Sequence, residues 1–417
     1  MAERPVVAAV RCEEYQQVES ALRRAVELLG GMGQYVQPGM RVALKPNLLR
    51  AAAPERATAT HPAVVAAMVR LVQEAGGTPV IVESPGGPST RARLRAVFDS
   101  TGMTKVAQET GCEISYNTTV RQVSFPEGRL LKRIDMLEAL AQADVVINLA
   151  KLKTHNLTRL TLAVKNCFGA VPGMVKIGYH AKLQDAMTFS KGLLDVACCV
   201  RPVLSIIDGV LAMDGNGPSG GDPFAGNVLL ASPDMVAVDV AATALVGWDP
   251  LSVTTTRAAV EWGLSSGRVE DLEWRGDALE MLRLEGFRGG SAAAVDPGLV
   301  PRGLRGRLRR LIAARGVDGR PLGEGDLPRE VVDAGTVPSA FRRWALRQLV
   351  VNPYAGRACN GCGLCVRHCP VKAIRLVDGR AHMDHSTCIR CYCCHELCPQ
   401  LAVELRRGWV GRLVYGP

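Results

Sequence analysis

What the chain lacks excludes several classes of protein. It contains no run of eighteen apolar residues, so we expect no membrane-spanning helix. Its first residues, Met-Ala-Glu-Arg-Pro, do not form the basic segment followed by an apolar stretch that marks a secretory signal. We therefore expect a cytoplasmic protein with no membrane span.

Two common nucleotide-binding motifs are also absent. No G-x-G-x-x-G follows the first expected strand, and no G-x4-G-K-S/T occurs anywhere in the chain. The sequence therefore gives no sign of a dinucleotide site or a P-loop nucleotide site. The glycine-rich stretch at residues 30–33 follows an expected helix and is typical of a helix C-cap and turn.

Positive charge is concentrated in one part of the chain. The 417 residues carry 50 Lys and Arg against 40 Asp and Glu, a net charge of +10. Such an excess can attract nucleic acid, anionic membranes or anionic substrates. Much of it lies at residues 302–315 and 342–347. We interpret residues 291–350 as a basic linker with packing helices, and we expect no nucleic acid partner.

The hydrophobic pattern of residues 6–247 predicts an α/β domain. Short β-branched apolar runs alternate there with amphipathic stretches, which indicates a mostly parallel sheet with flanking helices. Hydrophobic residues form 47% of the chain, enough for a sizeable core. Strands are expected at residues 6–10, 41–45, 79–83, 145–149, 203–207 and 227–231. Helices are expected at residues 13–29, 62–75, 91–99, 134–141, 157–168, 189–199, 235–246, 253–262, 304–314 and 340–349.

Cysteine is abundant near the end of the chain. Of 14 cysteines, nine fall between Cys359 and Cys398, too tightly spaced for a disulfide scaffold in a chain of this length, so metal ligation is the better interpretation. The run C-x2-C-x2-C-x3-C-P occurs twice, beginning at Cys359 and at Cys388. Zinc modules instead show C-x2-C pairs a dozen or more residues apart. The spacing therefore favours two 4Fe-4S clusters over zinc.

The two runs also predict which cysteines bind each cluster. Three thiolates at two-residue intervals can hold one face of a cluster, and the fourth cysteine of such a run ligates the other cluster. The first cluster is assigned to Cys359, Cys362, Cys365 and Cys398. The second is assigned to Cys388, Cys391, Cys394 and Cys369. Cys393 breaks the spacing and is excluded, and short strands are expected at residues 373–377 and 402–405.

These patterns give a domain division. We assign residues 1–290 to the α/β domain, 291–350 to the basic linker, 351–405 to a small α+β ferredoxin-like module and 406–417 to a tail. Iron-sulfur clusters carry single electrons, so we expect a redox partner protein that donates or accepts them.

Polar residues follow several expected strands of the α/β domain, where ligands bind in open α/β sheets. Lysines and glycine-rich turns there favour a pocket for a small anionic substrate or cofactor. The predicted binding residues are Lys45, Asn47, Ser84, Lys151, Lys153, Asp208 and Asn216. The alternative is a set of ordinary turns, in which Gly, Pro, Asn and Asp are common anyway.

Three further residues are predicted to be catalytic. His155 and His180 could deliver protons, because histidine titrates near neutral pH. Lys165 lies in an otherwise apolar stretch, where its charged group needs solvent or a partner. The alternative for Lys165 is a surface lysine whose aliphatic stem alone is buried.

Several motifs resemble the DUF362 family, a group of uncharacterised proteins often found with iron-sulfur modules. They are KPNLL at residues 45–49, THP at 60–62, SPGG at 84–87, KLKTH at 151–155, VKNCFG at 164–169, DG at 208–209, GNGP at 215–218 and VAVD at 236–239. The resemblance covers residues 6–250 and brings no assigned activity. Residues 352–405 resemble the two-cluster bacterial-type 4Fe-4S ferredoxin domain, which implies electron transfer.

A fainter resemblance is to nickel-pincer lactate racemase. That family has a histidine, a cofactor-bearing lysine ten residues later, a Pro-Gly turn and a metal-binding histidine. His155, Lys165, Pro172-Gly173 and His180 keep this order and the first interval. The glycine pair before that family's lysine is replaced here by Ala163-Val164. The resemblance implies that His155, Lys165 and His180 act together.

The leading hypothesis is therefore an iron-sulfur oxidoreductase that passes electrons through two clusters to a ligand in the α/β domain. One alternative is a ferredoxin-like electron carrier whose α/β domain only docks a partner. Another is a racemase-like enzyme with accessory clusters.

Overall fold

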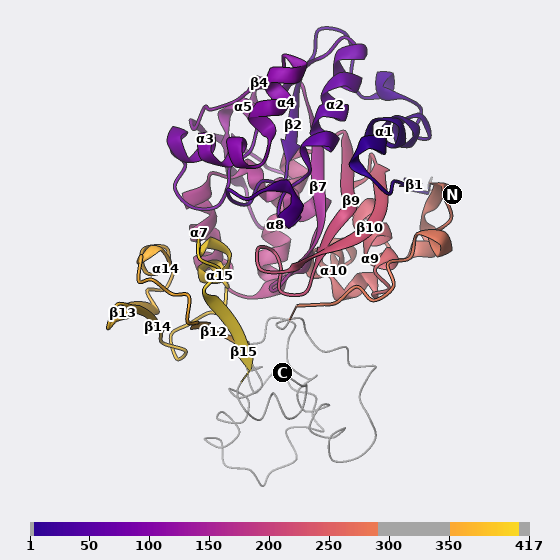
Figure 1. Ribbon diagram of the computed structural model, residues 1–417. Coiled ribbons are helices and arrows are strands. Elements are labelled where there is room, and N and C mark those ends of the chain that lie inside the picture. The colour runs from indigo at the N-terminus through magenta and orange to yellow at the C-terminus, as the bar shows by residue number, and fades with distance from the viewer. Residues whose placement is uncertain (1–3, 291–350, 408–417) are drawn as a thin grey trace, which may run out of the picture.

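The computed structural model describes residues 4–290 and 351–407. A nine-stranded sheet, ordered β11-β1-β10-β9-β7-β2-β3-β4 with β8 paired to β7, forms the centre of the larger part (Figure 1). Its strands are β1 (Val6–Arg11), β2 (Arg41–Pro46), β3 (Thr78–Ile81), β4 (Glu113–Ile114), β7 (Val145–His155), β8 (Arg159–Thr161), β9 (Leu204–Asp214), β10 (Asp222–Ser232) and β11 (Glu273–Gly276).

The sheet is mixed but mostly parallel, as the sequence predicts. Strands β9, β7, β2, β3 and β4 run parallel to their neighbours in this series, and β1 runs parallel to β11. Strand β10 is antiparallel to both β1 and β9, and β8 is antiparallel to β7. Parallel sheets need helical crossovers, so both faces are covered by helices.

Helices pack on the two faces of the sheet and divide the core. One face carries α1 (Val18–Glu27), α2 (Pro62–Glu74), α3 (Arg91–Ser100) and α4 (Met103–Thr110). The other carries α8 (Ala186–Val200), α9 (Met235–Leu245) and α10 (Thr254–Glu261). On β1, Ala8 and Val10 pack on the first side and Val7 and Ala9 on the second, because side chains alternate along a strand.

Two expected helices are wrong in part. In the range 134–141 only α5 (Glu138–Ala141) is helical, because the preceding residues form β6 (Arg133–Leu137), which pairs with β5 (Val120–Ser124). In the range 157–168, β8 comes first and is followed by the short α6 (Ala163–Asn166) and a 3-10 turn, η4 (Cys167–Ala170). Short apolar runs fit a strand as well as a helix, so tertiary pairing decides.

Three strands are several residues longer than expected. Strand β7 continues to His155 because β8 folds back on its end. Strand β9 continues to Asp214 and β10 already begins at Asp222, because these two strands pair along their length. Lys151, Lys153 and Asp208 therefore lie within strands and not in turns. Helices α4 and α7 (Gly173–Lys182) are additional to those that the sequence predicts.

The cysteine-rich module consists of small antiparallel pairs and short helices. Strand β12 (Val351–Ala355) pairs with β15 (Val403–Arg407), and β13 (Ile374–Val377) pairs with β14 (Arg380–Met383). The helices are α14 (Leu364–Arg367) and α15 (Cys393–Leu397). Figure 1 shows α15 beside α7 of the α/β domain, with α14, β13 and β14 farther out. The architecture confirms a small α+β module.

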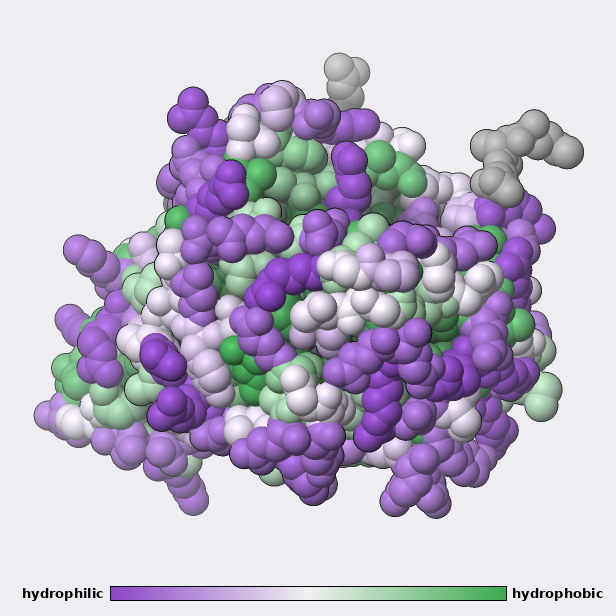
Figure 2. Space-filling view, turned by 90° about the horizontal axis from the view of Figure 1, so that it is seen from above, coloured by the Kyte–Doolittle hydropathy of each residue, from purple (hydrophilic) through white to green (hydrophobic). Residues whose placement is uncertain are grey.

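Seen from above in Figure 2, the α/β domain presents mostly hydrophilic side chains, with small apolar areas between them. Within residues 4–290 and 351–407, no helix is long and apolar enough to cross a membrane. The predicted basic linker at 291–350 and its helices at 304–314 and 340–349 lie outside the described residues, as do residues 408–417 of the predicted tail. The predicted start of that tail is wrong, because residues 406 and 407 belong to β15.

Candidate functional site

The predicted cluster ligands gather in two groups. Cys359, Cys362, Cys365 and Cys398 line one small cavity, although Cys398 comes from the second cysteine run. In the other group, Cys394 lies close enough to Cys391, Cys388 and Cys369 for their charges to interact. Both groups combine three cysteines of one run with the last cysteine of the other. The thiols present therefore fit groups held by four thiolates.

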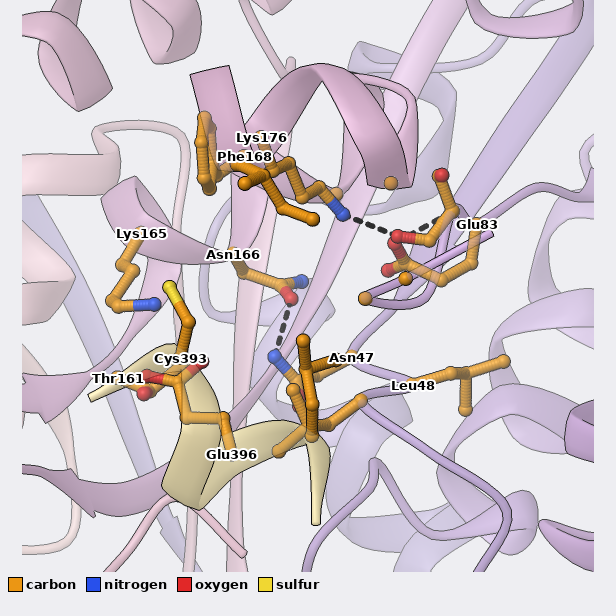
Figure 3. Close-up of a pocket in the computed structure, with 18 of the residues that line it drawn as sticks. Asn47, Leu48, Glu83, Thr161, Lys165, Asn166, Phe168, Lys176, Cys393 and Glu396 are labelled. Carbon is orange, nitrogen blue, oxygen red and sulfur yellow. Dashed lines mark hydrogen bonds between the residues drawn. The ribbon is translucent and has the colours of Figure 1, made fainter. Parts of the chain in front are cut away.

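A second cavity, of about 100 Å³, lies between the α/β domain and the module (Figure 3). Its wall on the domain side includes Asn47 after β2, Ser84 after β3, Thr161, Asn166 and Gly169 near α6, and Lys176 and His180 of α7. The wall on the module side is formed by Cys393, Glu396 and Leu397 of α15. The cavity is therefore completed only where the two parts meet.

Several polar atoms at the cavity lack partners. Asn47 Nδ2 donates a hydrogen bond to Asn166 Oδ1 at 2.8 Å (Figure 3), but Asn47 Oδ1 is buried with no partner among the described residues. The same is true of Ser84 Oγ and Thr161 Oγ1. Buried polar groups are nearly always hydrogen-bonded in folded proteins. Three unpaired oxygens around one cavity therefore point to a ligand or ordered water there.

Lys165 lines this cavity, and its ammonium lies near the Cys393 thiol (Figure 3). Among the described residues it makes no hydrogen bond or ion pair, in contrast to Lys176, whose Nζ donates to the Ser84 carbonyl. Burial lowers the pKa of Lys165, and the carboxylate of Glu396 opposes this shift. Lys165 therefore places an amino group without a bonded partner, within the described residues, at the edge of the cavity.

The two predicted catalytic histidines both lie near Glu396. His155 is 2% exposed, and its Nε2 lies 3.0 Å from Glu396 Oε1. Its Nδ1 accepts hydrogen bonds from the backbone N–H groups of Leu157 and Thr158, which places the proton of the neutral ring on Nε2. Burial lowers the pKa of His155 to about 4, so its ring is neutral at pH 7.

His180 lines the cavity and stacks on Phe189 with the ring centroids 4.3 Å apart. Burial lowers its pKa to about 4 as well. Burial opposes ionisation of Glu396, but His155 and Lys165 outweigh it and lower the pKa of that carboxyl. The structure therefore brings His155, Lys165 and His180 around one carboxylate, which the module supplies.

The other predicted lysines are buried beside the cavity, not in its wall. Lys45 Nζ forms an ion pair with Glu83 at 2.7 Å, and Lys151 Nζ forms one with Asp208 at 2.8 Å. Lys153 Nζ donates to the Thr58 carbonyl at 2.6 Å. Roles for Lys45, Lys151, Lys153 and Asp208 in anion binding stay predictions. The lysines that line the cavity are Lys165 and Lys176.

The module is held to the sheet by contacts from several loops. Arg50 donates to the carbonyl oxygens of Cys398 and Pro399, each at 3.1 Å. Nε2 of His395 lies 3.4 Å from the carbonyl oxygen of Asn216, which places the predicted residue Asn216 at this contact and not in the cavity wall. Together with the contact between His155 and Glu396, these interactions fix α15 against the cavity.

Sequence reasoning misses several residues of the site. Lys176 has a signal that could reveal it, because it precedes His180 by four residues and shares its face of a helix. Glu396 and Cys393 have no such signal, since both lie within a cysteine run whose spacing indicates only a cluster loop. Glu83 precedes Ser84 directly, but nothing in the sequence indicates that it pairs with Lys45.

Two family models match the chain. The model for DUF362, a domain of unknown function, matches residues 42–244, and the 4Fe-4S dicluster domain matches residues 354–399. A thylakoid-associated protein of Synechocystis is 40% identical over 273 residues, covering 63% of this chain and 81% of that protein. One component of an ion-translocating oxidoreductase complex of Methanosarcina acetivorans is 44% identical over 48 residues, which is 12% of this chain and 18% of that component.

Solved structures show only remote likeness. The lactate racemase apoprotein from Thermoanaerobacterium thermosaccharolyticum is 10% identical with a TM-score of 0.34, covering 55% of this chain and 54% of its own. A Thermotoga maritima protein is 12% identical with a TM-score of 0.28, covering 51% and 55%. Likeness at this level assigns no chemistry to the cavity.

Proposed function

This chain belongs to the DUF362 family and carries a 4Fe-4S dicluster domain, and from this premise we propose that it is an iron-sulfur oxidoreductase. Electrons pass through two 4Fe-4S clusters to a small anionic substrate or cofactor in the cavity between the two parts. The clusters, held by the eight cysteines predicted above, supply one-electron transfer. A redox partner protein exchanges electrons with them.

One observation carries the proposal. Helix α15 contains Cys394, a predicted ligand of the second cluster, and also Cys393 and Glu396, which line the cavity. A cluster held by Cys394 is therefore separated from the cavity only by the thickness of this helix. Neither a carrier that merely docks a partner nor accessory clusters for a racemase would require this shared element.

The cavity residues support an anionic ligand. Lys165 and Lys176 bring positive charge to its wall, and Lys153 lies close enough to Lys165 for their charges to interact. Glu83 is already paired with Lys45. Asn47, Ser84 and Thr161 supply polar groups that can fix the ligand's orientation. A carboxylate or oxoanion of a few atoms matches this set.

Reduction generally requires a proton as well as electrons, and Lys165 is the best-placed donor. His155 and His180 are neutral at pH 7, because burial lowers their pKa to about 4. The ammonium of Lys165 can instead release a proton into the cavity from Nζ, since burial lowers its pKa. His155 then holds the Glu396 side chain in place, and His180 forms part of the cavity wall.

The proposed location is the cytoplasm. The thylakoid association of the Synechocystis relative makes attachment to a membrane surface the alternative.

The test begins with anaerobic purification and mass spectrometry of any small molecule that leaves with the protein on denaturation. That molecule is then added to the dithionite-reduced chain after removal of excess reductant, and cluster reoxidation is followed by absorbance. Lys165→Ala should abolish reoxidation while leaving the cluster spectrum intact. Lys182→Ala, at an exposed position of α7, is the matched control and should behave like wild type. Equal reoxidation rates in both variants would overturn the role of the cavity.

A further inference from the structure

The surface beside the first group of predicted cluster ligands has its own character. Cys359, Cys362, Cys365 and Cys398 line the small cavity there, and Cys362 is exposed. Leu376 of β13 also lines this cavity and is 46% exposed, so it forms an uncovered apolar centre next to the predicted cluster site. Val377, the next residue of β13, is 41% exposed, but its side chain points to the opposite face of the strand.

Basic side chains lie near this apolar centre. Arg357, Arg367 and Arg380 are all exposed. Arg367 Nη1 donates to the Cys362 carbonyl at 3.2 Å, and Arg380 Nη2 donates to the Gly356 carbonyl at 2.6 Å, so both guanidinium groups lie beside the first cysteine loop. Between residues 351 and 383 the only acidic residue is Asp378, and Glu404, whose carboxylate lies beside Gly356, pairs with Arg406. The arginines therefore leave this surface with a net positive charge.

We propose that this outer face, defined by Arg357, Arg367, Leu376 and Arg380, docks a small acidic electron-carrier protein. The inference rests on the proposed iron-sulfur function. Each encounter transfers one electron, which oxidises the carrier and reduces the cluster held by Cys359, Cys362, Cys365 and Cys398. No bond is made or broken, and no proton has to move.

Charge complementarity and the size of the face favour this partner. The exposed arginines attract an acidic surface and raise its rate of encounter, while a small apolar centre lets the two proteins approach closely. Transient electron-transfer complexes bury little surface, so a few residues suffice. Figure 1 shows β13 and β14 farther from α7 than α15 is, so the strand that carries Leu376 lies on the outer part of the module.

In this proposal the two groups of cysteines have different roles. The first group would hold the cluster that receives electrons at the outer face, and the second would hold the cluster that supplies them to the cavity beside α15. Cys365 of the first group and Cys394 of the second lie close enough for their charges to interact, so the two groups are neighbours. This arrangement separates protein docking from ligand binding, so the two can be tested independently.

The test uses the cluster-loaded full chain and a reduced acidic plant-type ferredoxin as the probe. Stopped-flow absorbance measures the second-order rate of cluster reduction at several salt concentrations. Arg357→Glu/Arg367→Glu reverses two charges of the outer face. Arg121→Glu/Arg283→Glu makes the same change at exposed positions of the α/β domain. Leu376→Ser removes the apolar centre without altering charge, and reduced methyl viologen serves as a small donor that needs no docking.

The wild-type rate with ferredoxin should fall as salt is added. The outer-face charge reversal should slow it about tenfold or more at low salt and flatten the salt dependence, while the α/β control stays near wild type. Leu376→Ser should be slower than wild type at every salt concentration. Reduction by methyl viologen should be the same in all variants.

Three results would overturn the proposal. The first is an equal effect of the two charge reversals on the rate of reduction by ferredoxin, and the second is a wild-type rate that does not depend on salt. The third is that the chain binds anionic lipid vesicles and the outer-face charge reversal abolishes this binding without changing the rate with ferredoxin. Failure of the wild type to accept electrons from methyl viologen would instead refute the iron-sulfur function on which the proposal rests.

Discussion

Replacing Lys153 with methionine tests how strongly the site disfavours a buried positive charge. Lys153 is 1% exposed, and burial lowers its pKa from 10.5 to about 7, with the charge of Lys165 acting in the same direction. The difference is 10.5 minus about 7, or about 3.5 pH units. Each pH unit corresponds to about 1.36 kcal/mol, so the charged form costs the folded state on the order of 5 kcal/mol.

Methionine has a similar length and no charge, so the variant escapes this cost. It also loses the hydrogen bond from Nζ to the Thr58 carbonyl, worth about 1 to 3 kcal/mol. Below pH 7 the variant should therefore have the higher free energy of unfolding, by about 2 to 4 kcal/mol. Between about pH 7 and 10.5 the unfolded state binds the additional proton, so the wild type gains stability as the pH rises and the difference shrinks.

The assay is urea unfolding of the full chain under argon, followed by circular dichroism at about pH 6.5, 8 and 9.5. Lys182→Met, an exposed change of the same kind, is the control and should leave the free energy of unfolding nearly unchanged. A difference between wild type and Lys153→Met that does not vary with pH would refute the reasoning, as would a variant that is less stable at every pH.

Three other changes have expected outcomes. Cys393→Ser should leave iron and acid-labile sulfide at the wild-type amount of about eight each per chain, whereas Cys369→Ser should lose about half of both; equal losses would contradict the ligand assignment. Gly169→Ala should lower the melting temperature by several degrees, because a Cβ there would lie 2.1 Å from Glu83 Oε1, and an unchanged value would show that the ion pair can move. The chain without residues 350–417 should still unfold cooperatively in urea, because the sheet core is complete without the module; a broad transition would argue for a shared core.

The fold class could be predicted from the sequence because burial repeats at the spacing of each element. The expected strand at residues 6–10 and helix at 62–75 match β1 and α2 closely, since alternating apolar residues and a proline at the first helical turn are local signals. The range 134–141 contains no local signal that decides between a strand and a helix. Its apolar residues Ile134 and Met136 are spaced for a strand, but only pairing with β5 decides between strand and helix.

The site could be predicted less completely than the fold. Asn47, Ser84, Lys165 and His180 are predicted and do line one cavity, because the carboxyl ends of parallel strands meet at one edge of a sheet. The wall formed by Cys393 and Glu396 could not be foreseen. It depends on how the module docks through Arg50 and Asn216, contacts that join residues more than a hundred positions apart and leave no periodic trace in the sequence.

Electron paramagnetic resonance of the reduced chain tests most directly whether the clusters serve the cavity. Spectra are recorded with and without the small molecule that co-purifies, in wild type and in Cys388→Ser, which lacks a ligand of the second cluster. The molecule should alter the signal of the second cluster, and Cys388→Ser should lose reoxidation by it while still accepting electrons at the first cluster. If the molecule alters neither signal and reoxidises Cys388→Ser at the wild-type rate, electrons do not reach the cavity through the second cluster, and the proposed function is contradicted.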